Sequence, residues 1–218
     1  MPRRILILAG TLALLLVMAW QFPRLSCSEP LVESRASPPE PVPLCPWREP
    51  DADMHALFPG GTHYEAETRI LSGLRVELEE RLGRRPSAEE SALHLFRIYR
   101  DQIPLGTVVT RRVKGDYGAI ELVLAIGPDQ RVRGWRLQRS REPEPVLEAL
   151  LDPGWRRSFE GKGADSPWQL GLDIPQVAPV AAGSAAAVVE GARSLLILMA
   201  ATDQSSSSSR APPPHPHS

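Results

Sequence analysis

The feature that most constrains this chain is the uneven placement of its prolines. The sequence has 23 prolines in 218 residues: 8 lie in residues 23–50, 4 in the last seven residues and one at position 2. Because proline removes a backbone donor and interrupts helices and central strands, dense proline is incompatible with a packed core. The stretch 51–200 keeps only 10 prolines. We therefore expect one folded domain over residues 51–200, a proline-rich linker over 23–50 and a disordered tail over 201–218.

The first 22 residues predict a membrane anchor. Two arginines, at positions 3 and 4, precede eighteen uncharged residues, 5–22. That length is at the short end for a helix that spans a bilayer, and the flanking charges place the N-terminus in the cytoplasm. We expect a single-pass protein of the inner, cytoplasmic membrane with its domain on the periplasmic, extracytoplasmic side. A cleaved signal peptide and a lipoprotein signal at Cys27 remain as alternatives.

The two cysteines, Cys27 and Cys45, both lie in the linker. An extracytoplasmic setting permits a disulfide between them, and the sequence leaves that pairing open. Neither belongs to a C-x-x-C pattern, which excludes c-type haem attachment, thioredoxin chemistry and a cysteine zinc site.

The charge balance argues against a nucleic-acid partner. The sequence has 25 basic and 26 acidic residues, a net charge of −1, whereas nucleic-acid binding calls for a dominant basic surface. The densest basic run, residues 131–141, holds five arginines with no acid until position 142. This run is either a solvated strand and loop face or an anion site.

Hydrophobic periodicity predicts an α+β fold, an antiparallel β-meander flanked by helices, with an N-terminal transmembrane helix. A short helix is expected over Asp51–Phe58 and a longer one over Glu65–Leu82, closed by Gly83. Turn residues at hairpin spacing then separate four strands, of which the third is apolar on both sides and belongs inside the sheet. The four are Leu93–Arg100, Thr107–Lys114, Ala119–Ile126 and Arg131–Ser140. A capping box at Ser87–Glu90 leaves a helical start to the first of them as an alternative.

Three further helices are expected after the meander. Two are short, Glu144–Leu151 and Trp155–Phe159, separated by Asp152-Pro153-Gly154. Residues 177–201 are largely apolar but contain Glu190 and Arg193, which makes a buried helix over Ser184–Met199 a better interpretation than a second membrane span.

The order of several segments resembles the bacterial FMN-binding domain family. The segments are Val113–Ile126, Asp129 with Val132–Leu137, Arg141–Pro143, Trp155–Lys162 and Leu172–Ile174. This family includes the C subunit of the sodium-translocating NADH:quinone reductase and the G subunit of the Rnf complex. The resemblance, which spans about residues 52–198, implies one N-terminal membrane helix and an extracytoplasmic flavin domain.

The resemblance also implies a set of cofactor contacts. The family's Ser-Gly-Ala-Thr-x-Thr/Ser element, whose last hydroxyl can be esterified to the FMN phosphate, aligns with residues 179–184, and only Ser184 keeps a hydroxyl. FMN, if bound, is therefore expected to be held without a covalent link. A helix N-terminus suits a phosphate, and Gly183 allows close approach. The remaining implied contacts are Glu142, Lys162, Trp155 and Arg193.

Each of these positions also has a plain structural interpretation. Ser184 suits the N-cap of a helix, Glu142 a loop carboxylate and Trp155 a core anchor, while Lys162 and Arg193 suit solvated surface cations. Two functions thus remain open. One is an FMN-binding electron-transfer accessory of a membrane redox complex. The other is a flavin-free structural or assembly subunit that keeps the fold.

Overall fold

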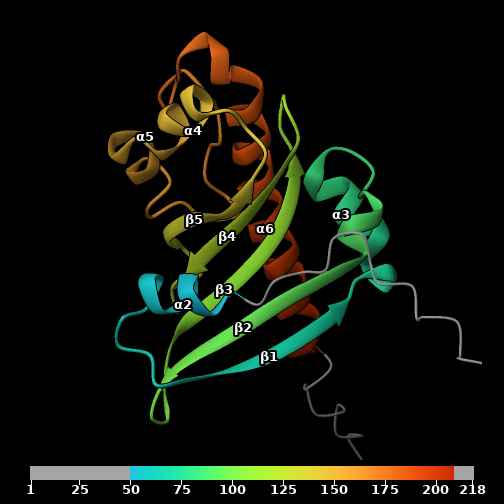
Figure 1. Ribbon diagram of the computed structural model, residues 1–218. Helices are drawn as coiled ribbons and strands as arrows, with labels where there is room; N and C mark the ends of the chain where they lie inside the picture. Colours follow the sequence, from blue (N-terminus) through green and yellow to red (C-terminus); the bar gives the residue numbers. More distant parts are fainter. Residues whose placement is uncertain (1–49, 209–218) are drawn as a thin grey trace, which may run out of the picture. The chain divides into compact units, whose positions relative to one another are not determined.

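The computed structural model describes residues 50–208 (Figure 1). The predicted membrane anchor over 1–22, the linker and both cysteines lie outside the described residues. The described part begins with α2 (Asp51–Leu57) and β1 (His63–Ile70), and the 3-10 helix η1 (Ser72–Leu74) leads into α3 (Arg75–Leu82). A second 3-10 helix, η2 (Ala88–Ser91), precedes the meander, which consists of β2 (Ala92–Arg100), β3 (Ile103–Lys114), β4 (Ala119–Ile126) and β5 (Val132–Ser140).

The C-terminal third is helical. It contains α4 (Glu144–Leu151), α5 (Pro153–Arg157), the 3-10 helix η3 (Pro179–Ala181) and the long α6 (Ala182–Ser208). The prediction of a buried helix here is confirmed, because 72% of the most apolar part of Pro179–Gln204 is buried in the domain. Among the described residues, this is the one helix long and apolar enough to span a bilayer.

All five strands form one antiparallel sheet in the order β1-β2-β3-β4-β5, which confirms the predicted α+β meander. β4 lies between β3 and β5, inside the sheet as expected, and every residue from Ile120 to Ile126 is buried. Helices α6 and α3 cover one face of the sheet, and α2 covers part of the other (Figure 1).

The prediction of one helix over Glu65–Leu82 is wrong for its first third. Residues His63–Ile70 form β1, and the α-helix is limited to Arg75–Leu82, preceded by the 3-10 helix η1. The apolar face that suggested a long helix is buried at Leu71, Leu78 and Leu82, whereas Ile70, the last residue of β1, is 70% exposed. Gly83 ends α3 as predicted, with φ 72° and its N–H bonded to the carbonyl of Glu79.

Several other boundaries differ from the prediction; β3, for example, begins at Ile103, four residues before the expected Thr107. Helix α5 starts at Pro153 instead of Trp155, because the Asp152 side chain accepts a hydrogen bond from the Trp155 N–H and Pro153 takes the first helical position. Helix α6 continues past residue 200, into the stretch expected to be a disordered tail. Its extension is anchored by Thr202, which is buried, and by Asp203, both of which accept hydrogen bonds from Arg69 of β1.

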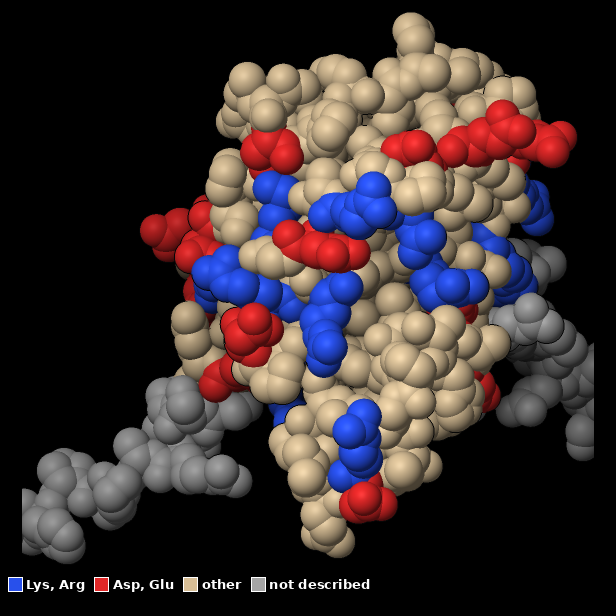
Figure 2. Space-filling view, turned by 90° about the vertical axis from the view of Figure 1, so that its left-hand side faces the viewer, with Lys and Arg blue, Asp and Glu red and all other residues tan. Residues whose placement is uncertain are grey.

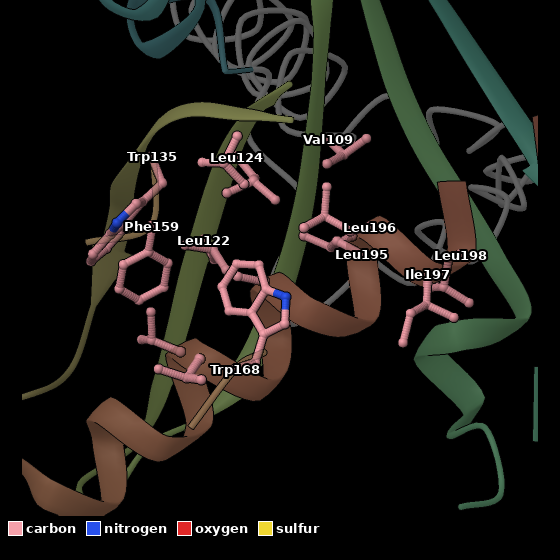
Figure 3. Packing of buried hydrophobic residues seen from close by; sticks show 14 of the residues in the cluster. Val109, Leu122, Leu124, Trp135, Phe159, Trp168, Leu195, Leu196, Ile197 and Leu198 are labelled. Atoms are coloured by element: carbon pink, nitrogen blue, oxygen red, sulfur yellow. The ribbon is translucent and has the colours of Figure 1, made fainter. Parts of the chain in front are cut away.

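The main core lies between the sheet and α6 and includes a cluster of aromatic rings (Figure 3). Phe159 lies at its centre, with its ring centroid 5.2 Å from Trp135, 5.0 Å from Trp155 and 5.7 Å from Trp168. Leu122 and Leu124 of β4 face the leucines of α6 on this side (Figure 3). A smaller core under α2 joins Met54 and Phe58 to the opposite face of the sheet; its members in the sheet are Ile98, Val108, Val123 and Ala125.

The arginine run at residues 131–141 is distributed among separate partners. Arg136 pairs with Asp53 at 2.7 Å and Arg139 with the buried Glu121 at 2.6 Å, while Arg131 donates to the carbonyl of Gly161 at 2.8 Å. Figure 2 shows basic and acidic side chains interspersed on this side of the domain. The solvated-face interpretation fits this pattern better than a single anion site.

Candidate functional site

The N-terminus of α6 meets two loops that are distant in sequence. One is the turn 115–118 between β3 and β4, closed by a hydrogen bond from the Gly115 N–H to the carbonyl of Gly118. The other is the segment after β5 that contains Glu142. Ser184, which is fully buried, lies where these three pieces meet. We refer to Asp116, Glu142, Gly183 and Ser184 as the Ser184 site.

The Ser184 hydroxyl links both loops. It accepts a hydrogen bond from the Asp116 N–H at 2.9 Å and donates one to Oε2 of Glu142 at 2.8 Å. Glu142 is only 5% exposed, and its Oε1 accepts a hydrogen bond from the Tyr117 N–H at 3.1 Å. The buried hydroxyl and carboxylate therefore satisfy each other and two backbone donors, as buried polar groups must.

The Asp116 carboxylate occupies the N-terminal end of α6. Its Oδ2 accepts the Ser184 N–H at 3.0 Å, which satisfies one of the free donors of the first helical turn and complements the positive end of the helix dipole. A Cβ at Gly183 would overlap the Asp116 carboxylate, and a Cβ at Gly115 would overlap the Glu142 carboxylate. Both glycines are therefore required for this close approach.

Ser184 is not the N-cap of α6, as one sequence interpretation held. The helix begins at Ala182, so Ser184 is its third residue, and η3 with Pro179 leads directly into it. The capping role belongs to Asp116, which comes from a hairpin turn 68 residues earlier in the chain. The sequence of this turn predicts only a hairpin connection, and no local pattern reveals that the turn packs against the start of a helix.

The structure brings together three of the six residues that the family resemblance implied as cofactor contacts. Ser184, Gly183 and Glu142 lie in the Ser184 site, while the other three lie elsewhere. Trp155 is 3% exposed and donates its indole N–H to the carbonyl of Pro175 at 3.0 Å, inside the aromatic cluster. This is the core anchor that the structural interpretation of Trp155 describes.

Lys162 and Arg193 have their own partners. The Lys162 ammonium pairs with Asp173 and lies 5.6 Å from the centre of the Trp168 ring. Burial acts to raise the Asp173 pKa, but the hydrogen bond from Lys162 and the Gln169 backbone outweigh it, so that pKa is lowered overall. Arg193 lies nine residues along α6 from Ser184, about 14 Å away along the helix axis. It donates to the carbonyls of Arg81 and Leu82, where α3 ends.

A second group of charges lies between η2, β3 and α6. The Glu90 carboxylate, whose side chain is fully buried, contacts Arg84 at 2.8 Å and Arg111 at 2.8 Å, and it also accepts the Ser87 N–H at 2.6 Å. The predicted capping box at Ser87–Glu90 is confirmed. It caps the N-terminus of the short helix η2, which ends before β2 begins. Arg84 also bonds Glu190 of α6 at 3.0 Å, so this network joins three elements.

We expect Ser184→Ala to lower the free energy of unfolding by about 1–3 kcal/mol, because it leaves the Asp116 N–H and a Glu142 oxygen buried without their partner. Urea unfolding followed by circular dichroism measures this change. Ser72→Ala, at an exposed position, is the matched control and should change the free energy by less than about 0.5 kcal/mol. An equal, small effect at both positions would contradict the structural role assigned to the Ser184 hydroxyl.

Among residues 50–208, no cluster of histidine, cysteine, aspartate and glutamate has the geometry to hold a metal ion. Comparison of the chain with models of known protein families gives no match. Comparison with curated protein sequences gives no match either. The resemblance to FMN-binding domains thus remains a prediction from the order of sequence segments, and the Ser184 site stands on its geometry alone.

Proposed function

We propose that this chain is a flavin-free relative of the FMN-binding domains, which acts as a structural or assembly subunit of a membrane complex. The observation that supports this proposal is the carboxylate of Asp116 at the N-terminus of α6, bonded to the Ser184 N–H at 3.0 Å. In the resembled family a phosphate would lie at this end of the helix. Here the chain supplies its own anion.

The remaining residues of the site do not fit a phosphate either. The Ser184 hydroxyl is fully buried and already bonded to the Glu142 carboxylate, which is itself 5% exposed. A phosphate beside Ser184 would meet two carboxylates at close range, and like charges at such distances repel each other strongly. The two cations that the resemblance implied as cofactor contacts, Lys162 and Arg193, lie outside this site and are paired with Asp173 and Glu190.

The membrane setting of the proposal comes from the sequence. An anchor over residues 1–22 and a proline-rich linker over 23–50 would hold the domain away from the bilayer on its extracytoplasmic side. The partner is then a membrane redox complex or another membrane protein. The domain would contribute surface and position to that complex, and no electron carrier of its own.

The competing proposal is an electron-transfer accessory that binds FMN without a covalent link. The observation in its favour is that Ser184, the one hydroxyl retained from the family's element, lies at the start of α6 beside Glu142. This function would require Asp116 to leave the helix N-terminus and the Ser184 site to open.

Flavin content decides between the two functions. The full chain, purified in detergent from a host supplied with FMN and a flavin transferase, should be colourless, and added FMN should keep its full fluorescence. A flavin-bearing member of the family expressed in the same host is the positive control. Yellow protein that releases FMN on denaturation would overturn the flavin-free proposal, as would fluorescence retained on a denaturing gel and lost in Ser184→Ala.

A further inference from the structure

β1 is an edge strand, and no other strand of the described part of the chain pairs with its outer edge. It pairs only with β2, over all eight residues His63–Ile70, and most of these residues are exposed. The opposite edge, β5, is partly occupied: the Val132 N–H donates to the carbonyl of Lys162 at 2.9 Å, and Arg156 donates to the carbonyl of Trp135 at 2.7 Å. Within residues 50–208, no other segment hydrogen-bonds the outward backbone groups of Ala66, Thr68 or Ile70.

The register with β2 shows which backbone groups face this edge. Ile70 lies opposite Ala92, and the Leu71 N–H donates to the carbonyl of Ser91 at 2.8 Å, which makes Leu71 a hydrogen-bonded position. In an antiparallel pair such positions alternate along the strand. The odd-numbered residues therefore bond β2, and the N–H and C=O groups of the even-numbered residues point outward. These are Tyr64, Ala66, Thr68 and Ile70.

We propose that the β1 edge binds a second copy of this chain, strand to strand and antiparallel, so that the two five-stranded sheets form one continuous sheet. The outward groups of both strands belong to even-numbered residues. A two-fold axis must then pass through a residue of β1 and not between two residues, because only this arrangement places even residues opposite even residues. The registers that keep most of the strand paired are centred on Ala66, Glu67 or Thr68.

Side chains select the register centred on Glu67. Centring on Ala66 would place Glu65 opposite Glu67 twice, which is unfavourable for like charges. Centring on Thr68 would place Tyr64 opposite Ser72, beyond the end of the strand.

In the Glu67 register, all residues from 64 to 70 are paired. Ile70, which is 70% exposed, lies opposite Tyr64 of the second copy, and Glu65 lies opposite Arg69. The one like-charge contact is Glu67 with its own copy. Each Glu67 is already bonded to Arg69 at 2.7 Å and to Arg97 at 3.2 Å, so its charge is largely compensated within each copy.

β1 also lacks several of the features that keep edge strands apart. Proteins protect such edges with proline, with a β-bulge or with charged side chains, above all lysine. The charged residues of β1 are Glu65, Glu67 and Arg69. The sequence His63–Ile70 contains neither proline nor lysine, and its register with β2 runs without a shift over all eight residues. A matching strand can therefore add to this edge without any rearrangement of β1.

The oligomeric state of the full chain in detergent tests the proposal. The protein mass measured by light scattering, corrected for detergent, should be twice the 24.0 kDa of one chain. Ile70→Arg removes the apolar contact, and Ala66→Pro removes an outward N–H while leaving the bonds to β2. Each should raise the dimer dissociation constant at least about tenfold. Val76→Arg, at a residue of α3 that is 83% exposed, is the matched control and should leave the dimer unchanged.

Single cysteines test the register. In a background with Cys27→Ser and Cys45→Ser, Glu67→Cys should form a disulfide-linked dimer in much higher yield than Ala66→Cys or Thr68→Cys. The facing Cα atoms at residue 67 would be about 4.5 Å apart, within disulfide range, whereas the other two positions would face their own copies across about 8 Å.

Three results would overturn the inference. One is a protein that stays monomeric at about 100 μM. This result would count against the dimer both if the β1 amide hydrogens exchange freely with solvent and if another segment of the same chain protects them from exchange. Another is a dimer insensitive to both edge variants, and the third is a highest disulfide yield at residue 66 or 68. The inference rests on β1 alone, and flavin binding would leave it intact.

Discussion

Glu90→Gln is expected to lower the free energy of unfolding by about 3–5 kcal/mol at pH 7, because it removes one charge from a buried ion network. The Glu90 side chain is fully buried between two arginines, each at 2.8 Å. Glutamine keeps the size of the side chain but leaves the positive charge of Arg111, whose side chain is 12% exposed, without its counter-ion. Urea unfolding at pH 7 measures the loss.

The matched control for this variant is Glu89→Gln, one residue earlier and exposed. It should change the free energy of unfolding by less than about 0.5 kcal/mol. A loss at Glu90 no larger than at Glu89 would show that the network of Arg84, Arg111 and Glu90 contributes nothing to stability.

The same network predicts how stability depends on pH. Burial acts to raise the Glu90 pKa, but the hydrogen bonds from Arg84 and the Ser87 backbone and the charge of Arg111 outweigh it and lower this pKa from 4.5 to about 2. A carboxyl with a lowered pKa in the folded state stabilises the protein above its unfolded pKa, and this contribution is lost as the pH falls from about 4.5 towards 2. The difference in pKa corresponds to about 3 kcal/mol.

This pH dependence can be isolated by comparing two proteins. The wild type should lose about 3 kcal/mol more than Glu90→Gln between pH 6 and pH 2, since the variant has no carboxyl to titrate at this position. Glu67 and Glu121, whose pKa values are also lowered, titrate equally in both proteins and cancel in the difference. Parallel curves for wild type and variant would contradict the assignment.

Phe159→Ala is expected to destabilise the domain by about 3–5 kcal/mol, the range for truncation of a buried aromatic side chain. Phe159 is fully buried, and its ring lies beside Trp135 and Trp168 (Figure 3) and also contacts Trp155. Removal of the ring leaves a cavity bounded by three indole rings. Because these rings also pack against other neighbours, they cannot easily move to fill it. Tryptophan fluorescence should change in the folded state as well as on unfolding.

Two further variants control for the Phe159 result. Phe159→Leu keeps much of the volume and should cost clearly less than Phe159→Ala. Tyr117→Ala removes an aromatic ring that is 58% exposed and should cost less than about 0.5 kcal/mol. If Phe159→Ala costs no more than Tyr117→Ala, the aromatic cluster is not the packed centre of the main core.

Much of this fold could be predicted because its segments carry strong local patterns. Ala119–Ile126 and Glu144–Leu151 form β4 and α4 with the predicted boundaries. β1 was missed although its residues alternate, with charged or polar side chains at the odd positions and Tyr64, Ala66, Thr68 and Ile70 at the even ones. The helical spacing of the apolar residues that begin at Ile70 favoured one long helix instead. The side chains on the exposed face of β1 are the less polar ones, so its pattern does not point to a buried face.

The candidate site could be predicted only in part. Ser184, Gly183 and Glu142 were identified through a family's segment order, and the structure brings them together. Asp116 could not be found in this way, because its role depends on the approach of a turn to a helix 68 residues later. The partners of Lys162 and Arg193 could not be predicted either, since a sequence does not reveal which carboxylate or carbonyl will bind a given cationic side chain.

The position of α6 determines when this domain can complete its fold during synthesis. The helix supplies one side of the main core, its start is bonded to the β3–β4 turn, and its end is bonded through Asp203 to Arg69 of β1. Because α6 is the last described element to be made, the apolar face of β4 stays uncovered until α6 itself has emerged. A chain that must cross a membrane before this happens would depend on chaperones to keep that face from aggregating.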